Sequence, residues 1–188
     1  MFQNDEIKEQ YDGYRALARV YDRLNAEIDY RGWADFVESC FACYLKEKPT
    51  LLLDLACGTG SMTHVLASRG YDMIGVDNSE DMLRIAMEKA QDNGDEIMYL
   101  LQDMRELELY STVGTVISVC DSVNYILEEE ELLEVFKRVN NYLFPGGIFL
   151  FDFNTVYKYR DVIGDTTIAE NREACSFIWE NFYYEEEQ

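Results

Sequence analysis

The spacing of apolar residues along this chain changes near residue 50. Before that point, apolar side chains recur every three or four residues, which predicts two amphipathic helices over residues 11–24 and 33–44. After it, short apolar runs alternate with helical stretches, the pattern of consecutive βαβ units. The sequence therefore predicts an α/β fold in which a helical segment precedes a mostly parallel sheet.

Five apolar runs predict the strands of this sheet. Helices are predicted between them. One of these helices is expected to begin at Ser79, which is suited to cap it, and Glu80 and Asp81 complement the dipole of its first turn. Pro145-Gly146-Gly147 is expected to end the last of these helices. The pattern then predicts a short helix and a final strand. The strands are predicted at residues 51–54, 72–76, 96–101, 115–120, 148–153 and 176–184, and the short helix at 156–163.

Aspartates follow four of the predicted strands. Asp54, Asp77, Asp103 and Asp121 each come at the end of an apolar run, where a buried strand has no structural need for a carboxylate. In open α/β sheets, ligands bind outside the carboxyl ends of the strands, at the point where the strand order reverses. We therefore expect the four side chains to line one crevice, and its ligand to offer hydrogen-bond donors or positive charge.

Length and charge limit the class of protein. With 188 residues and 48% hydrophobic content, the chain has the size of one α/β domain. Its formal net charge of −21 disfavours binding to nucleic acid and to anionic membranes, since both need clustered Lys and Arg. Neither a signal peptide nor an apolar run long enough to span a membrane is evident. We expect a cytoplasmic protein.

The five cysteines indicate no disulfide framework, because they are odd in number and scattered. Cys40 and Cys43 form a lone C-x-x-C inside a helical pattern, and His64 is the only histidine. No metal site is predicted. His64 is interpreted as a solvated or capping side chain, with a catalytic base as the alternative.

The turn after the first predicted strand carries small residues at Ala56, Gly58 and Gly60, which let the backbone approach a ligand closely. A dinucleotide fingerprint would have a glycine where this chain has Thr63, and a pyrophosphate would lie badly beside the Asp54 carboxylate. An ammonium group there would be stabilised instead. With Asp77 suited to ribose hydroxyls and Asp103 to an adenine amine, the series of groups matches S-adenosylmethionine.

The motifs LDLACGTG, GVDNSEDML, LLQDM, CDSVNYI and LFPGGIFLFDFN resemble, in order and spacing, those of class I S-adenosylmethionine-dependent methyltransferases. The opening YRALARVYDRL is similar to that of the small-molecule branch of this family. The resemblance covers nearly the whole chain. It implies a Rossmann-like, doubly wound, mostly parallel sheet with helices on both faces and an N-terminal helical cap.

The resemblance also implies which residues bind the cofactor. It assigns Asp54 and Gly58 to the methionyl part, Asp77 to the ribose, and the Gln102 to Met104 segment to the adenine. Three tyrosines of the first predicted helix would form a lid, although packing on the sheet is an equal alternative for them. The full set of expected cofactor-binding residues is Tyr11, Tyr14, Tyr21, Asp54, Ala56, Gly58, Gly60, Asp77, Asn78, Met82, Gln102, Asp103, Met104, Cys120 and Asp121.

Methyl transfer needs alignment and exclusion of water more than a dedicated base. Where a base is needed, Asp121 is the candidate to take a proton from an attacking amine or hydroxyl, with a role in cofactor contact as the alternative. Tyr125 is the candidate to shape the acceptor pocket. The expected product is S-adenosylhomocysteine, and the expected acceptor is an N or O atom of a small molecule.

The expected organisation is one methyltransferase domain over residues 1–188. It comprises a cap at 1–48, a Rossmann-like core at 49–154 and the start of an incomplete lid or substrate region at 155–188, with the final strands of the family fold missing. Two alternatives remain open at this point: a catalytically silent S-adenosylmethionine-binding module and a nicotinamide-dependent oxidoreductase. The sequence does not indicate the oligomeric state.

Overall fold

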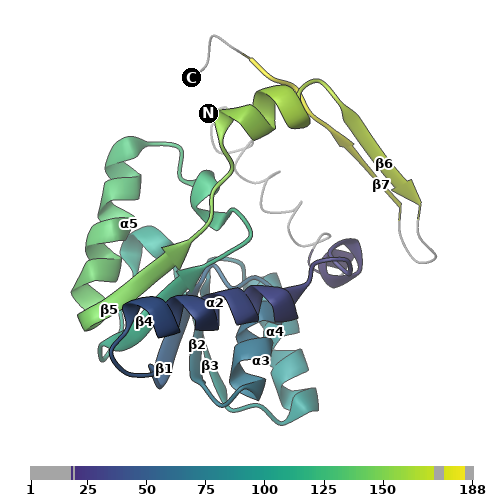
Figure 1. The fold of residues 1–188 in the computed structure, drawn as a ribbon. Coiled ribbons are helices and arrows are strands. Elements are labelled where there is room, and N and C mark those ends of the chain that lie inside the picture. Colours follow the sequence, from purple (N-terminus) through teal and green to yellow (C-terminus); the bar gives the residue numbers. More distant parts are fainter. Residues whose placement is uncertain (1–17, 19, 172–175, 185–188) are drawn as a thin grey trace, which may run out of the picture. The chain divides into compact units, whose positions relative to one another are not determined.

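A computed structural model describes residues 18, 20–171 and 176–184 of the chain (Figure 1). The chain divides into two compact units, the first ending at Asp152 and the second beginning at Phe153. The first predicted helix is described only in part, with helical backbone at Ala18 and at residues 20–24. Tyr11 and Tyr14 lie outside the described residues.

The first unit is built on a five-stranded sheet in the order β3-β2-β1-β4-β5, with every neighbouring pair parallel. The order reverses between β1 and β4, as in a doubly wound fold. The predicted fold class is confirmed. The strands are β1 Leu51–Leu55, β2 Asp72–Asp77, β3 Ile97–Leu101, β4 Val113–Ser118 and β5 Leu143–Phe151.

Helices cover both faces of this sheet (Figure 1). On one face, α2 and α3 pack their apolar sides against Leu52, Met73 and Ile117. On the other face, Val135 and Val139 of α5 pack against residues of β1, β2 and β4. The helices are α2 Tyr30–Tyr44, α3 Ser61–Ser68, α4 Glu80–Asn93 and α5 Glu129–Tyr142, and the short 3-10 helices are η1 Met104–Glu106 and η2 Ser122–Tyr125.

Local signals set the ends of α4. The Ser79 hydroxyl accepts a hydrogen bond from the Met82 amide at 3.3 Å, and acidic residues occupy the first turn. Gly94 ends the helix in the left-handed conformation, with a φ of 73°. The start at Ser79 agrees with the prediction, because capping depends on residues adjacent in sequence.

The start of β5 differs from the prediction. The strand begins at Leu143 rather than Ile148, because Leu143 already pairs with Val113. The register then shifts, and Thr115 pairs with Ile148. Pro145-Gly146-Gly147 therefore forms an irregularity inside the strand and does not separate helix from strand. The helix itself ends earlier, at Tyr142.

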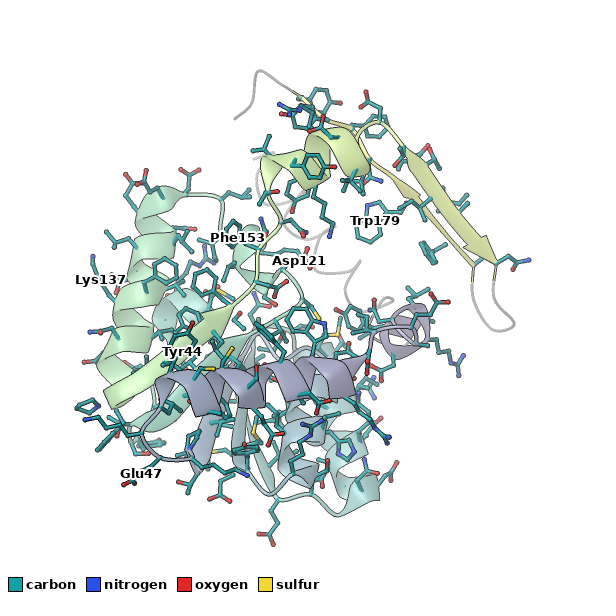
Figure 2. All side chains as sticks on the ribbon, viewed as in Figure 1. Tyr44, Glu47, Asp121, Lys137, Phe153 and Trp179 are labelled. Atoms are coloured by element: carbon teal, nitrogen blue, oxygen red, sulfur yellow. The ribbon has the colours of Figure 1, made fainter. Side chains whose placement is uncertain are left out.

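The second unit contains a hairpin and a short π-helix, η3 Lys158–Val162. The strands β6 Thr167–Asn171 and β7 Ser176–Glu180 pair antiparallel. The predicted last strand corresponds to β7, which carries Trp179 (Figure 2), but its partner β6 was not predicted. The sequence of β6 lacks the long apolar alternation that would have indicated a strand.

Tyr99 of β3 supports the turn that follows β1. It pairs in register with Gly75 of β2, and a Cβ added at Gly75 would lie 2.6 Å from two Tyr99 ring carbons. A Cβ at Gly60 would lie 2.6 Å from the Tyr99 hydroxyl. The ring thus passes over Gly75 and ends under Gly60, so glycine at both positions makes room for one side chain.

We predict that Gly75→Ala destabilises the protein by about 1–3 kcal/mol, since the added methyl overlaps the Tyr99 ring. Urea unfolding would measure the loss. In a Tyr99→Ala background the same substitution should cost clearly less, because the overlapping ring is gone. An equal cost in both backgrounds would contradict this account of Gly75.

Candidate active site

The turn after β1 has three residues in the left-handed region. Ala56, Gly58 and Gly60 have φ values of 63°, 55° and 73°. The Cys57 amide donates to the Val76 carbonyl at 2.9 Å, which fixes the turn against β2. Left-handed φ is unfavourable for alanine, so the backbone at Ala56 is held in a strained conformation by these surroundings.

Asp54 lies inside the fold at the end of β1 with 1% of its surface exposed. Its Oδ2 accepts a hydrogen bond from the Thr63 hydroxyl at 2.6 Å. Burial raises the pKa of the Asp54 carboxyl to about 7, and the nearby Asp77 carboxylate adds to the shift. An ionised carboxylate here would be stabilised by a cationic ligand group.

Asp77, at the end of β2, holds the turn after β1 and the start of α4 together. Its carboxylate accepts from the Gly58 amide at 2.8 Å and from the Ser79 amide at 2.9 Å. Burial raises the pKa of Asp77, and these amide donors oppose the rise. The carboxylate is thereby fixed beside the glycine turn.

Asp22, in the segment before α2, bridges the first turn of α3 and the middle of α4. One of its oxygens accepts from the Thr59 hydroxyl at 2.5 Å and from the Ser61 hydroxyl at 3.2 Å. The other accepts from the Lys89 ammonium at 2.9 Å. The protein's own carboxylate therefore lies where a dinucleotide enzyme holds a phosphate, at the start of the helix after the glycine turn.

A cleft with about 360 Å³ of empty space, including the part open to solvent, lies at the carboxyl ends of β1 and β4. These are the strands between which the sheet order reverses. Burial raises the pKa of the Tyr21 and Tyr30 hydroxyls, so both stay neutral and can donate. The lining residues are Tyr21, Tyr30, Asp54, Ala56, Cys57, Gly58, Thr59, Ser61, Met62, Val119, Cys120 and Ser122.

The segment after β4 is the second strained turn. Cys120 and Asp121 have φ values of 63° and 54°, and the Asp121 amide donates to Asp152 Oδ2 at 3.1 Å. Asp121, labelled in Figure 2, directly precedes η2. Burial raises the pKa of the Cys120 thiol to about 11, with the Asp152 charge adding to it, so the thiol is neutral. Tyr125, in η2, is 62% exposed.

The segment after β3 is held by polar side chains. The Asp103 carboxylate is paired with the Arg105 guanidinium, which holds the pKa of Asp103 below its usual range. The Gln102 side chain accepts from the Glu108 amide at 2.9 Å and donates to the Glu108 carbonyl at 3.1 Å. Met104 begins η1.

The predicted residues follow the strand order along one edge of the sheet. Asp54 and Asp77 lie at the ends of β1 and β2, and Asp103 and Asp121 come after β3 and β4, so all four are at the carboxyl edge of the sheet. Of these four, Asp54 alone lines the cleft. The cleft lining includes five of the predicted residues and leaves the others outside it. Those in the lining are Tyr21, Asp54, Ala56, Gly58 and Cys120; those outside are Gly60, Asp77, Asn78, Met82, Gln102, Asp103, Met104 and Asp121.

Several residues of the site had no sequence signal. Tyr30 and Asp22 come from before the sheet, and Lys89 from the middle of α4, so only the folded chain brings them to the turn. Thr63 did carry a signal, because it replaces the glycine of a dinucleotide fingerprint. In the structure it is the hydrogen-bond donor to Asp54.

Other candidate chemistry is accounted for by packing. His64 of α3 contacts Asp95 through Nδ1, which ties α3 to the turn before β3. Cys40 is buried in α2 and Cys43 is exposed. Within the described part of the chain, no group of three or more His, Cys, Asp or Glu side chains is placed to hold a metal. None of the helices described there is long and apolar enough to cross a membrane.

The fold and the cleft define a class I S-adenosylmethionine-dependent methyltransferase. Residues 52–147 match the family described as "Methyltransferase domain", and the chain belongs to that family. YqeM of Bacillus subtilis (strain 168) is 38% identical over 170 residues, which are 90% of this chain and 66% of YqeM. A relative from Geobacillus sp. (strain WCH70) is 38% identical over 88% of this chain and 67% of its own length. The chain thus spans about two thirds of these relatives.

Solved structures support the same assignment. An S-adenosylmethionine-dependent methyltransferase from Clostridium acetobutylicum ATCC 824 is 33% identical, with a TM-score of 0.79 over 92% of this chain and 70% of that protein. DesVI of Streptomyces venezuelae is 26% identical, with a TM-score of 0.71 over 86% of this chain and 67% of DesVI. S-adenosylmethionine is the cofactor of this class, and the buried Asp54 carboxylate fits its ammonium group.

We predict that Asp54→Asn stabilises the ligand-free protein, and more so as the pH rises. The folded-state pKa near 7 lies above the unfolded value of about 3.9. The folded protein therefore keeps a proton that the unfolded chain has lost, and its stability falls as the pH rises through this window. At pH 8 the wild type carries the full penalty, roughly 2–4 kcal/mol, which the neutral amide avoids.

Urea unfolding of the two proteins at pH 5 and pH 8 would measure this effect. Asp72→Asn, at the exposed beginning of β2, is the matched control and should show no such pH-dependent gain. A difference between Asp54→Asn and wild type that is the same at both pH values would contradict the predicted linkage.

We also predict that Asp22→Ala destabilises the protein by about 1–2 kcal/mol, because three hydrogen bonds to a half-exposed charge are lost. Lys89→Ala should then cost less in the Asp22→Ala background than in the wild type. Asp92→Ala, on an exposed position of α4, is the control. If Asp22→Ala unfolds at the same urea concentration as this control, the bridge contributes nothing.

Proposed function

We propose that the protein transfers a methyl group from S-adenosylmethionine to an N or O atom of a small-molecule acceptor by in-line displacement. The observation that carries the proposal is Asp54, a carboxylate buried in a cleft lining at the switch point of the sheet. Among the described residues no basic side chain pairs with Asp54, and burial of an ionised carboxylate in this way is unfavourable for the empty protein. A ligand that brings positive charge reverses this penalty, and S-adenosylmethionine carries an ammonium and a sulfonium.

Each part of the cofactor has a proposed partner along the sheet edge. Asp54 and the Gly58 turn receive the methionyl part, with Ala56 and Gly60 providing the close backbone approach. Asp77 receives the ribose hydroxyls, and Gln102, Asp103 and Met104 receive the adenine. Asn78 and Met82 flank the ribose and adenine positions in this proposal. Asn78 directly follows β2, and Met82 lies in the first turn of α4.

The bound cofactor supplies a methyl group on positively charged sulfur, which needs little further activation. The protein's tasks are to align the acceptor and exclude water. Tyr21 and Cys120 line the cleft. Burial raises the pKa of the Tyr21 phenol, and nearby groups that include Cys120, Tyr125 and Asp121 add to the rise, so these residues share one neighbourhood. We propose that this neighbourhood, at the end of β4, receives the acceptor.

Asp121 and Tyr125 are the proposed catalytic residues. The Asp121 amide donates to Asp152 Oδ2 at 3.1 Å, which fixes this residue after the end of β4, and a carboxylate at this position can orient a substrate or take its proton. The exposed Tyr125 would shape the acceptor pocket. A cofactor contact is the alternative role for Asp121.

The names of the relatives favour a small-molecule acceptor. A dTDP-3-amino-3,4,6-trideoxy-alpha-D-glucopyranose N,N-dimethyltransferase of Streptomyces venezuelae is 34% identical over 70% of this chain and 54% of that enzyme. A demethylmenaquinone methyltransferase of Thermus thermophilus is 28% identical over 71% of this chain. The strong negative charge of this chain favours a neutral or basic acceptor, because charge steers encounter.

The two alternatives differ in what they predict. A nicotinamide-dependent oxidoreductase needs a pyrophosphate at the start of α3, and Asp22 puts a carboxylate against the hydroxyls of Thr59 and Ser61 there. A silent binding module would bind the cofactor without consuming it. Binding and turnover therefore have to be measured separately.

We predict that the protein binds S-adenosylmethionine and S-adenosylhomocysteine, but not NADH, in calorimetric titrations. Asp77→Asn should weaken binding of both by about tenfold or more, since a charged acceptor of the ribose hydroxyls is lost. Asp72→Asn, at the other end of the same strand, should bind as the wild type does. NADH binding without adenosyl-ligand binding would overturn the proposed function.

Turnover is tested by following S-adenosylhomocysteine with a panel of small amines and alcohols. Formation of this product with one acceptor, and its loss in Asp121→Asn, is expected if Asp121 is the base. Cofactor binding with no product from any acceptor would favour the silent module.

A further inference from the structure

Arg105, which the proposed function does not use, links two elements at the adenine end of the sheet edge. Its guanidinium donates to both oxygens of Asp103, from Nε to Oδ1 at 2.9 Å and from Nη2 to Oδ2 at 2.6 Å. A third donor, Nη1, reaches Glu131 Oε2 in the first turn of α5 at 2.9 Å. One planar side chain thus fixes the orientation of the Asp103 carboxylate relative to α5.

The pairing leaves Asp103 able to accept a further hydrogen bond. A carboxylate has about four acceptor positions. Among the described residues, the Asp103 oxygens take three hydrogen bonds, all from Arg105. Oδ1 accepts from the backbone amide at 2.8 Å and from Nε, and Oδ2 accepts from Nη2. Oδ1 is therefore fully engaged, whereas Oδ2 keeps acceptor capacity for one donor from a ligand.

We propose that Arg105 is a positioning residue that directs Oδ2 of Asp103 at the exocyclic amine of the adenine, and so sets the preference of the site for an amino over an oxo group at that position. This inference rests on the proposed function. The paired carboxylate can accept from an amine but not from a carbonyl oxygen, which would meet it with like partial charge.

Arginine is suited to this task because its planar fork binds a carboxylate with two parallel hydrogen bonds. Glu131 accepts from Nη1, so the fork cannot rotate away from Asp103 without breaking a second ion pair. A lysine would provide the charge but a single point of contact. The geometry of the carboxylate, and not its charge alone, is what Arg105 contributes.

The test compares S-adenosylhomocysteine with S-inosylhomocysteine, in which an oxo group replaces the adenine amine and N1 carries a proton. The measured quantity is the ratio of the two dissociation constants in calorimetric titrations. For the wild type we expect a preference of about ten- to a hundredfold for the adenosyl ligand, the worth of one hydrogen bond to a charged group.

In Arg105→Ala, the preference should fall to within about threefold, through weaker binding of the adenosyl ligand alone. Arg105→Lys should fall between the wild type and Arg105→Ala, and it serves as the test if the alanine variant does not fold. Arg84→Gln, which removes an exposed arginine paired with Glu88 on α4, is the matched control and should keep the wild-type ratio.

The outcomes separate this inference from the proposed function. An unchanged ratio in Arg105→Ala, or equal weakening of both ligands, would show that Arg105 only supports the loop. A wild type that binds both ligands equally would also overturn the inference while leaving methyl transfer in place. A wild type that binds neither ligand would overturn the proposed function itself.

Discussion

The structure depends on a carboxylate buried at the end of β1. Asp54 is almost fully enclosed, and its side chain is held by the hydroxyl of Thr63. Burial of such a group costs free energy in the ligand-free protein, which is why its pKa rises to about 7. Protonation removes this cost at low pH, and a ligand of positive charge would offset it where Asp54 is ionised.

The carboxylates along the sheet edge fall into two kinds. Asp22 and Asp103 each face a basic side chain, Lys89 and Arg105 respectively. The Asp54 and Asp77 carboxylates accept hydrogen bonds from hydroxyl and amide groups instead, and burial raises the pKa of both. Within the described residues, neither Asp54 nor Asp77 is paired with a basic side chain, and both lie where the cationic half of the cofactor is proposed to bind.

Sequence patterns predicted the sheet and most of its helices well, because the signals are local. Ser79 and Gly94 mark the ends of α4 within a few residues of where the chain turns. The predicted start of β5 was wrong, because Leu143 pairs with Val113, which is distant in sequence. This pairing overrides the tendency of Pro145-Gly146-Gly147 to form a turn. The strand β6 was missed since its hairpin partner, not its own pattern, defines it.

Local signals also indicated part of the candidate site. The position of an aspartate at the end of a predicted strand can be inferred from the sequence, because parallel strands end at one edge of the sheet. Their partners cannot: Asp22 is 37 residues from Thr59, and no periodicity relates the two positions. Pairs that are close in sequence, such as Asp103 and Arg105, are an intermediate case. Their spacing allows the two side chains to form an ion pair, but whether they do so depends on the fold.

Asp22 and Thr63 together favour the proposal that this glycine turn receives a cationic ligand, although the same backbone could hold a phosphate. The amides at the start of a helix attract anions, and here Asp22 supplies one from within the chain, tied to the hydroxyls of Thr59 and Ser61. Thr63 then takes the place of a packing glycine and turns its hydroxyl to Asp54. Side chains, rather than the turn itself, decide the charge of the ligand.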